Sequence, residues 1–161
     1  MKNIVFGLVF LLILSSCSTN SSEDIFLNSK SISNYNYNSD EIELSKLINE
    51  YRNNIGLNTL GLINHISNKC VEHNNYMIAN NVVNHAYFQE RSDNIISVLG
   101  ASNVSEIVAY NYFIPQAALD AWLKSPTHKD AIEGNFTDFG LAITKSSESR
   151  KNYFTVIFIK R

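Results

Sequence analysis

The chain divides into three stretches that differ in their pattern of apolar and polar positions. An uninterrupted apolar run covers Ile4–Leu14, after a short start that contains Lys2. Residues 18–39 are rich in Ser and Asn and show no sustained period, a composition that cannot bury enough apolar surface to offset chain ordering. Helical or strand-like periods begin near residue 40. We therefore predict a leader (1–16), a disordered linker that starts at Cys17 (17–39) and one folded domain (40–161).

The leader has the layout of a bacterial lipoprotein signal. At about 1.5 Å per residue, the run Ile4–Leu14 falls well short of a hydrocarbon core of about 30 Å, which indicates a signal peptide. The tetrapeptide LSSC resembles a lipobox, which implies cleavage before Cys17 and acylation of its sulfur with chains such as palmitate. Two or three chains, at about 0.8 kcal/mol per buried CH₂, would anchor the protein to the bacterial cell envelope, in the outer membrane if the cell has one. The alternative is an ordinary secretory signal that happens to end in Cys.

Helical spacing of apolar residues predicts five helices in the domain. The first begins at Ser39 or Asp40, where Asp40 and Glu43 have capping-box spacing, and it stops at Gly56. The others cover 62–80, 91–99, a stretch opened by Pro115 and a short turn after Ser125-Pro126.

Short apolar runs at 139–144 and 153–159 flank a polar loop and predict a hairpin. The second run is apolar on both faces, so it needs cover on both sides, and helices are the available cover. Ile107–Ala109 would add a further strand. The predicted fold class is therefore α/β, a three-layer α/β/α sandwich with a small, mainly antiparallel sheet.

Composition removes several classes of protein. The 161 residues carry 13 Lys+Arg against 15 Asp+Glu, a net charge of −2, so a nucleic-acid partner is not expected. A hydrophobic fraction of 45% with only 6 Gly and 2 Pro excludes collagen-like and wholly disordered chains. Cys17 and Cys70 are too few for a disulfide scaffold, and Cys70 falls on the apolar stripe of a helix, where a thiol is inert packing.

Several segments, in order along the chain, resemble the bacterial SCP-like branch of the CAP superfamily (cysteine-rich secretory, antigen-five and pathogenesis-related proteins). The motif Trp-x-x-Ser-Pro-x-His and the block ANN…NH…R are the most specific parts of the resemblance. The segments are LINEYRNNIGLNTL (47–60), CVEHNNYMIANNVVNHAYFQER (70–91), SEIVAY (105–110), AWLKSPTHKDAIEGNFTDFGLAI (121–143) and NYFTVIFI (152–159).

The resemblance implies a central cleft lined by His85, Glu106 and His128. A further Glu of animal and plant members falls at or near Ser125, so three candidates remain instead of four. Two neutral imidazoles and a carboxylate suit Zn²⁺ or another divalent cation, the carboxylate serving as ligand or as base for a bound water. The alternative is a hydrogen-bonded polar cluster that orders the cleft without metal.

Two other side chains are expected near this cleft. His73 lies on the apolar face of the second helix, either as a satisfied core histidine or as a support behind the cleft. Arg91 is expected to pair with a carboxylate and so to fix the loop after His85.

Three functions are compatible with these residues. The first is a binding module that takes a lipid-like, peptidoglycan-derived or protein ligand. The second is a metal-dependent hydrolase of envelope polymers or peptides that works through Glu106, His85 and His128, and the third is a purely structural surface protein. We name no nucleophile. Ser125 stands before Pro at a helix start and is expected to be an ordinary N-cap, whose Oγ would be hydrogen-bonded to backbone N–H groups of the helix.

Overall fold

The computed structural model describes residues 34–161. The predicted signal peptide and Cys17 lie outside the described residues, as does most of the predicted linker. No helix within 34–161 combines the length and the apolar character that crossing a bilayer requires. The elements are α1 (Ser39–Asn54), β1 (Gly61–Leu62), α2 (Asn64–Asn80), α3 (Phe88–Leu99), β2 (Asn103–Tyr110), α4 (Pro115–Lys124), α5 (Pro126–Glu133), β3 (Asp138–Lys145) and β4 (Asn152–Lys160).

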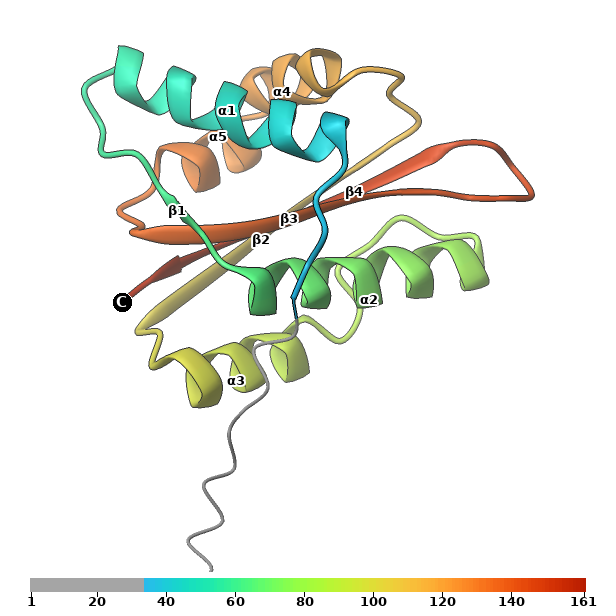
Figure 1. Cartoon of the computed structure of the whole chain (residues 1–161), viewed down its shortest axis with the longest axis horizontal. Coiled ribbons are helices and arrows are strands. Elements are labelled where there is room, and N and C mark those ends of the chain that lie inside the picture. The colour runs from blue at the N-terminus through green and yellow to red at the C-terminus, as the bar shows by residue number, and fades with distance from the viewer. Residues whose placement is uncertain (1–33) are drawn as a thin grey trace, which may run out of the picture.

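The predicted three-layer sandwich is confirmed. Helices α1, α4 and α5 cover one face of the sheet, and α2 and α3 cover the other (Figure 1). The strand order is β1-β3-β4-β2, and the sheet is mixed because β1 pairs with β3 in parallel while the other two pairings are antiparallel. The sequence pattern missed β1 and included Leu62 in the following helix, which begins only at Asn64.

Strand β4 is buried on both faces, as its unbroken apolar pattern predicts. Phe154, Val156 and Phe158 join the core under α1 and α4. Ile157 and Ile159 join the core under α2 and α3. The two helical layers therefore bind the sheet through opposite sides of one central strand.

Helix α2 lies unusually close to β3 because β3 contains a glycine. A Cβ atom on Gly140 would lie 2.5 Å from both Ile66 Cβ and Ser67 N, closer than real Cβ contacts. Any larger residue at this position would push α2 away from the sheet.

The cap of α1 differs from the predicted one. The N-cap is Asn38, and its side chain and that of Glu41 form the capping box, so the expected pairing of Asp40 with Glu43 is wrong. Glu41 is chosen over its neighbours because it is buried: its Oε1 accepts from the Tyr35 hydroxyl (2.7 Å) and from the Ile143 amide (2.9 Å).

The last residues of the predicted linker pack on the domain. Besides the Tyr35–Glu41 bond, the hydroxyl of Tyr37 lies 2.9 Å from Ser67 Oγ on α2. Residues 34–38 thus cross from the α2 layer to the start of α1 and belong to the folded unit (Figure 1).

The part of β3 that extends beyond β1 is an edge of the sheet, and side chains protect it. Strand β1 pairs with only the first part of β3, at Asp138 and Phe139. Beyond it, the Leu141 amide donates to Ser67 Oγ (3.0 Å) and the Ala142 carbonyl accepts from Asn74 Nδ2 (3.0 Å). Unpaired edge groups invite association with other chains, and here polar side chains occupy them.

Candidate functional site

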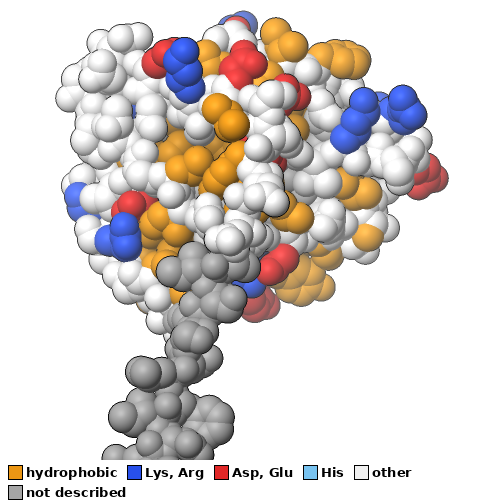
Figure 2. Space-filling view, viewed as in Figure 1, with side chains coloured by type: hydrophobic (Ala, Val, Ile, Leu, Met, Phe, Trp, Pro, Cys, Tyr) orange, Lys and Arg blue, Asp and Glu red, His pale blue; other side chains and the backbone are white. Residues whose placement is uncertain are grey.

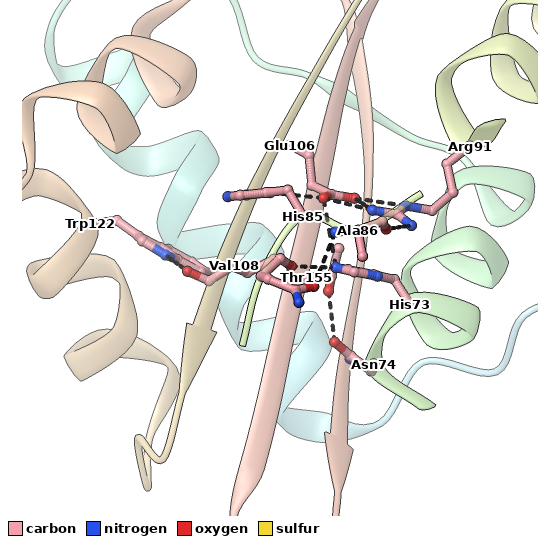
Figure 3. Close-up of polar contacts among 10 residues, drawn as sticks. His73, Asn74, His85, Ala86, Arg91, Glu106, Val108, Trp122 and Thr155 are labelled. Atoms are coloured by element: carbon pink, nitrogen blue, oxygen red, sulfur yellow. Dashed lines mark hydrogen bonds and ion pairs between the residues drawn. The ribbon is translucent and has the colours of Figure 1, made fainter. Parts of the chain in front are cut away.

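The candidate site is built around Glu106 on β2, the strand at the opposite edge of the sheet. The Glu106 side chain is only 1% exposed. Arg91 on α3 donates to both of its oxygens, Nε to Oε2 at 2.9 Å and Nη2 to Oε1 at 2.8 Å, and Nη1 donates to the Ala86 carbonyl at 2.7 Å (Figure 3). A bidentate guanidinium both neutralises the buried carboxylate and fixes its orientation.

Glu106 in turn orients His85, which lies in the segment between α2 and α3. His85 Nδ1 is 2.9 Å from Glu106 Oε1, while 48% of the His85 side chain is exposed. An ionised carboxylate can only accept, so Nδ1 is the donor, and in the neutral ring Nε2 is left as an acceptor. Two of the three predicted site residues, His85 and Glu106, therefore lie in direct contact, with one imidazole nitrogen fixed and the other available.

His73 is a residue of α2 that lies behind this pair and is buried. Its Nε2 donates to the Asn84 carbonyl (2.8 Å) and is 3.7 Å from Glu106 Oε1. Burial, opposed by the Glu106 charge, lowers the pKa of His73, so the ring is neutral. Within the described residues, its Nδ1 is buried without a hydrogen-bond partner. His73 is therefore a core histidine, but the expectation that both of its ring nitrogens are satisfied is wrong.

His128 approaches from the other helical layer. It lies on α5 and lines a cavity of about 250 Å³ together with Val108, Trp122 and Ser125. Burial lowers the pKa of His128, and the ring of His85 lowers it further, because two imidazolium charges disfavour each other.

Strand β2 is the element that brings the two layers together. Helix α3, on one face of the sheet, and helix α5, on the other, both contact this strand. Trp122 Nε1 donates to the Val108 carbonyl (2.9 Å), which ties α4 to this edge beside His128. Figure 3 shows Arg91 and Trp122 on opposite sides of the strand, with Glu106 and His85 between them.

The donor set open to a cation is small. Across residues 34–161, no group of three or more His, Cys, Asp or Glu side chains is arranged to hold a metal ion. Both oxygens of Glu106 are bonded to Arg91 or His85, which gives this carboxylate an orienting role. The imidazoles of His85 and His128 are the side chains that suit Zn²⁺ in this neighbourhood.

Ser125 does not behave as its sequence context predicts. It is the N-cap residue of α5, but in the described structure its side chain makes no capping hydrogen bond, so the expectation that capping commits its Oγ is wrong. Helix α5 has Pro126 in its first turn, which removes one of the N–H groups that a cap would satisfy.

Cys70 is confirmed as a packing residue. It is completely buried, and burial raises the pKa of its thiol, so the reactive thiolate is disfavoured.

One contributor that the sequence analysis did not identify is Asn84. Its carbonyl accepts from His73, and its side chain accepts from the Ala86 amide at 3.0 Å, which shapes the turn that presents His85. An Asn directly before a histidine in a short loop is typical of such a side-chain turn, and this was the available signal.

With this geometry established, comparisons identify the class of protein. Residues 46–158 match the model of the CAP cysteine-rich secretory protein family, and the chain belongs to that family. The resemblance seen in the sequence is thereby confirmed. No curated protein sequence matches the chain.

Solved structures agree with the family assignment. An outer surface protein of Borrelia burgdorferi aligns with a TM-score of 0.70 and 23% identity, over 79% of this chain and 96% of that one. An extracellular SCP-domain protein of Bacillus anthracis aligns with a TM-score of 0.65 and 22% identity, over 76% of this chain and 40% of its own. A cysteine-rich secretory protein of Staphylococcus aureus gives 0.62 and 17%, over 76% of this chain and 39% of its own. At these identities the likeness concerns the fold.

Proposed function

We propose that this chain is an exported lipoprotein of the bacterial cell envelope whose CAP domain binds a ligand at His85, Glu106 and His128. The observation that carries the proposal is the orientation of His85. A buried ion pair between Arg91 and Glu106 holds Nδ1 of a half-exposed ring and leaves its Nε2 available. A ring that only filled space at the surface would need no such support.

A divalent cation is an optional part of this site. His85 and His128 would hold it, and Glu106 would orient His85 in the manner of carboxylates that lie behind metal-binding histidines. When bound, such a cation supplies an electrophilic centre for oxygen atoms of the ligand.

The surroundings of His128 favour a ligand with an apolar part. The cavity of about 250 Å³ beside it is lined largely by ring and aliphatic side chains, including Tyr110, Tyr112 and Trp122. Lipid-like, peptidoglycan-derived and protein ligands can all offer an apolar group next to oxygen donors. Export is supported by the structural neighbours, two of which carry the descriptions outer surface protein and extracellular protein.

Zinc titration of the purified chain, followed by calorimetry, tests the site. We expect binding to the parent chain and its loss in His85→Ala and in His128→Ala. Glu106→Gln should weaken binding by roughly 10–100-fold, because the orienting carboxylate is lost. His65→Ala is the matched control, since this half-buried histidine contacts Asn94 Oδ1 (2.8 Å) and is not one of the three site residues.

Two results would contradict the metal part of the proposal. If zinc does not bind at millimolar concentration, the cation and the hydrolase alternative both fall, and an apolar-ligand module is left. If His65→Ala weakens binding as much as His85→Ala, the metal is bound nonspecifically.

A further inference from the structure

We infer that one end of the domain is a docking surface for an anionic lipid bilayer, which adjoins the cavity beside His128 at Tyr112. Two loops form it: residues 111–114, between β2 and α4, and residues 145–151, the turn of the β3–β4 hairpin. We call these two loops the end surface. It goes beyond the proposed function, because it provides a second membrane contact besides the acyl anchor expected at Cys17.

The apolar part of the end surface is the pair Phe113 and Ile114. Phe113 is 87% exposed, more than any other large apolar side chain in residues 34–161, and Ile114 is 56% exposed. Both precede Pro115, whose ring begins α4. Two adjacent apolar side chains at a loop tip gain by leaving water for the boundary of headgroups and acyl chains.

The two loops are joined to each other, so their side chains act on one surface. The Asn111 amide donates to the Asn152 carbonyl (2.8 Å), and Asn152 Nδ2 donates to the Tyr112 carbonyl (3.0 Å). Lys151 Nζ lies 5.2 Å from the centre of the Tyr110 ring. In Figure 1 the hairpin tip and the β2–α4 loop project at the same end of the molecule.

The charged part of the end surface is basic in a chain that is acidic as a whole. Residues 145–151 contain the exposed cations Lys145, Arg150 and Lys151 against one carboxylate, Glu148, whereas the chain has a net charge of −2. Figure 2 shows basic side chains gathered at the end where the hairpin projects. Cations flanking an exposed aromatic residue match the headgroup region of an anionic bilayer, where each cation strengthens binding about fivefold.

The predicted linker is long enough for the end surface to face the membrane that holds the acyl anchor. The chain from Cys17 to Asn34 can reach at most about 55 Å at about 3.3 Å per residue. A domain of this size has a diameter of about 36 Å. An acyl anchor at Cys17 therefore allows the end surface to meet the same membrane.

The test measures a dye attached at one position of the folded domain, so that membrane binding through the N-terminal segment is not mistaken for docking of the end surface. The full chain carries Cys17→Ser, and an environment-sensitive dye is attached to Ser147→Cys on the hairpin turn; Cys70 is buried and stays unlabelled. The dye is attached to Ile42→Cys on α1 as the control, because Ile42 is exposed, as Ser147 is, but lies outside the end surface. Vesicles of phosphatidylglycerol and phosphatidylcholine are compared with vesicles of phosphatidylcholine alone.

We expect the dye at position 147 to brighten and shift to the blue with anionic vesicles only, and the dye at position 42 to stay unchanged. Arg150→Gln with Lys151→Gln should weaken the binding about 30-fold at low salt, and Phe113→Ser should lower the emission change without altering the fold. Docking on an acidic protein partner instead would leave both dyes unchanged with every vesicle. That result, or equal responses at the two positions or with the two vesicle types, would overturn the proposal.

Discussion

The two edges of the sheet differ in the side chains that lie against their unpaired backbone groups. At the β3 edge, Ser67, Asn74 and Glu41 occupy the free backbone groups beyond β1, and each of these side chains is buried. At the β2 edge, Trp122 takes one carbonyl, and a charged group, Glu106, is placed on the strand beside a half-exposed histidine. One edge is closed by hydrogen bonds that serve stability, while the other keeps a charged and accessible arrangement.

This comparison teaches where function can reside in the fold. Buried polar groups at the β3 edge are satisfied entirely by their neighbours and leave nothing for a ligand. At the β2 edge, the buried pair of Arg91 and Glu106 contacts the half-exposed ring of His85, whose Nε2 is not used in this contact. Arg91 offsets the cost of burying the Glu106 carboxylate, so substitution of Arg91 is the strongest test of the difference between the two edges.

The largest effect is expected from Arg91→Ala. Removing the guanidinium leaves the buried Glu106 carboxylate without its cation, which should lower the free energy of unfolding at neutral pH by about 3–5 kcal/mol. Urea unfolding at pH 7 measures this loss.

The matched control for that change is Arg161→Ala. Arg161 also binds a carboxylate bidentately, that of Asp138, but its side chain is 47% exposed. A pair this open to solvent should contribute about 1 kcal/mol or less. Equal losses from the two substitutions would show that burial at the β2 edge has no special weight.

The next effect is expected at the other edge, from Asn74→Ala. The change leaves the Ala142 carbonyl and the Thr155 hydroxyl without their buried partner, at a cost of about 1–3 kcal/mol. Zinc binding should be unaffected, because the hydrogen bonds of Asn74 go to Ala142, Thr144 and Thr155 and not to His85 or His128. Asn80→Ala, on the exposed end of α2, is the control and should change stability by less than about 0.5 kcal/mol. A large effect of Asn74→Ala on zinc affinity would remove the distinction between the edges.

Much of the fold could be predicted because burial produces a regular pattern in the sequence. The unbroken apolar run of β4 implies cover on both faces, and the structure supplies it. Strand β1 could not be predicted, since a two-residue strand has no period to detect. The capping box was assigned to the wrong pair, because the choice of Glu41 depends on its distant contact with Ile143.

The sequence predicted which residues belong to the candidate site but not how they are arranged in space. His85, Glu106 and His128 came from resemblance, since no spacing along the chain relates the two histidines. The role of Arg91 as the partner of Glu106 was expected in kind, but a bidentate contact depends on how α3 packs on β2. The half-exposed state of His85 likewise follows from its place beyond the sheet edge.

The smallest expected effect is a pH dependence of stability that belongs to the β2 edge. The pKa of His73 is lowered by burial, and that of His128 is lowered by burial and by the His85 charge, both from an ordinary value of 6.5. Below pH 6.5 the unfolded chain therefore binds more protons than the folded one at these two rings. Their contribution to stability is present above pH 6.5 and is lost as the pH falls through the lowered values.

Urea midpoints measured between pH 8 and pH 5 should accordingly fall with pH in the parent chain and fall less in His73→Gln. Asp138, whose pKa lies below its ordinary value of 3.8 because Arg161 and Thr137 outweigh its burial, acts only in a more acidic window and does not interfere. Asn74→Ala, the matched change at the other edge, should lower the midpoints by the same amount at every pH in this range. If the midpoints of the parent chain do not change with pH, the histidines at the β2 edge bind protons equally well in the folded and the unfolded chain. The two edges would then differ in packing alone.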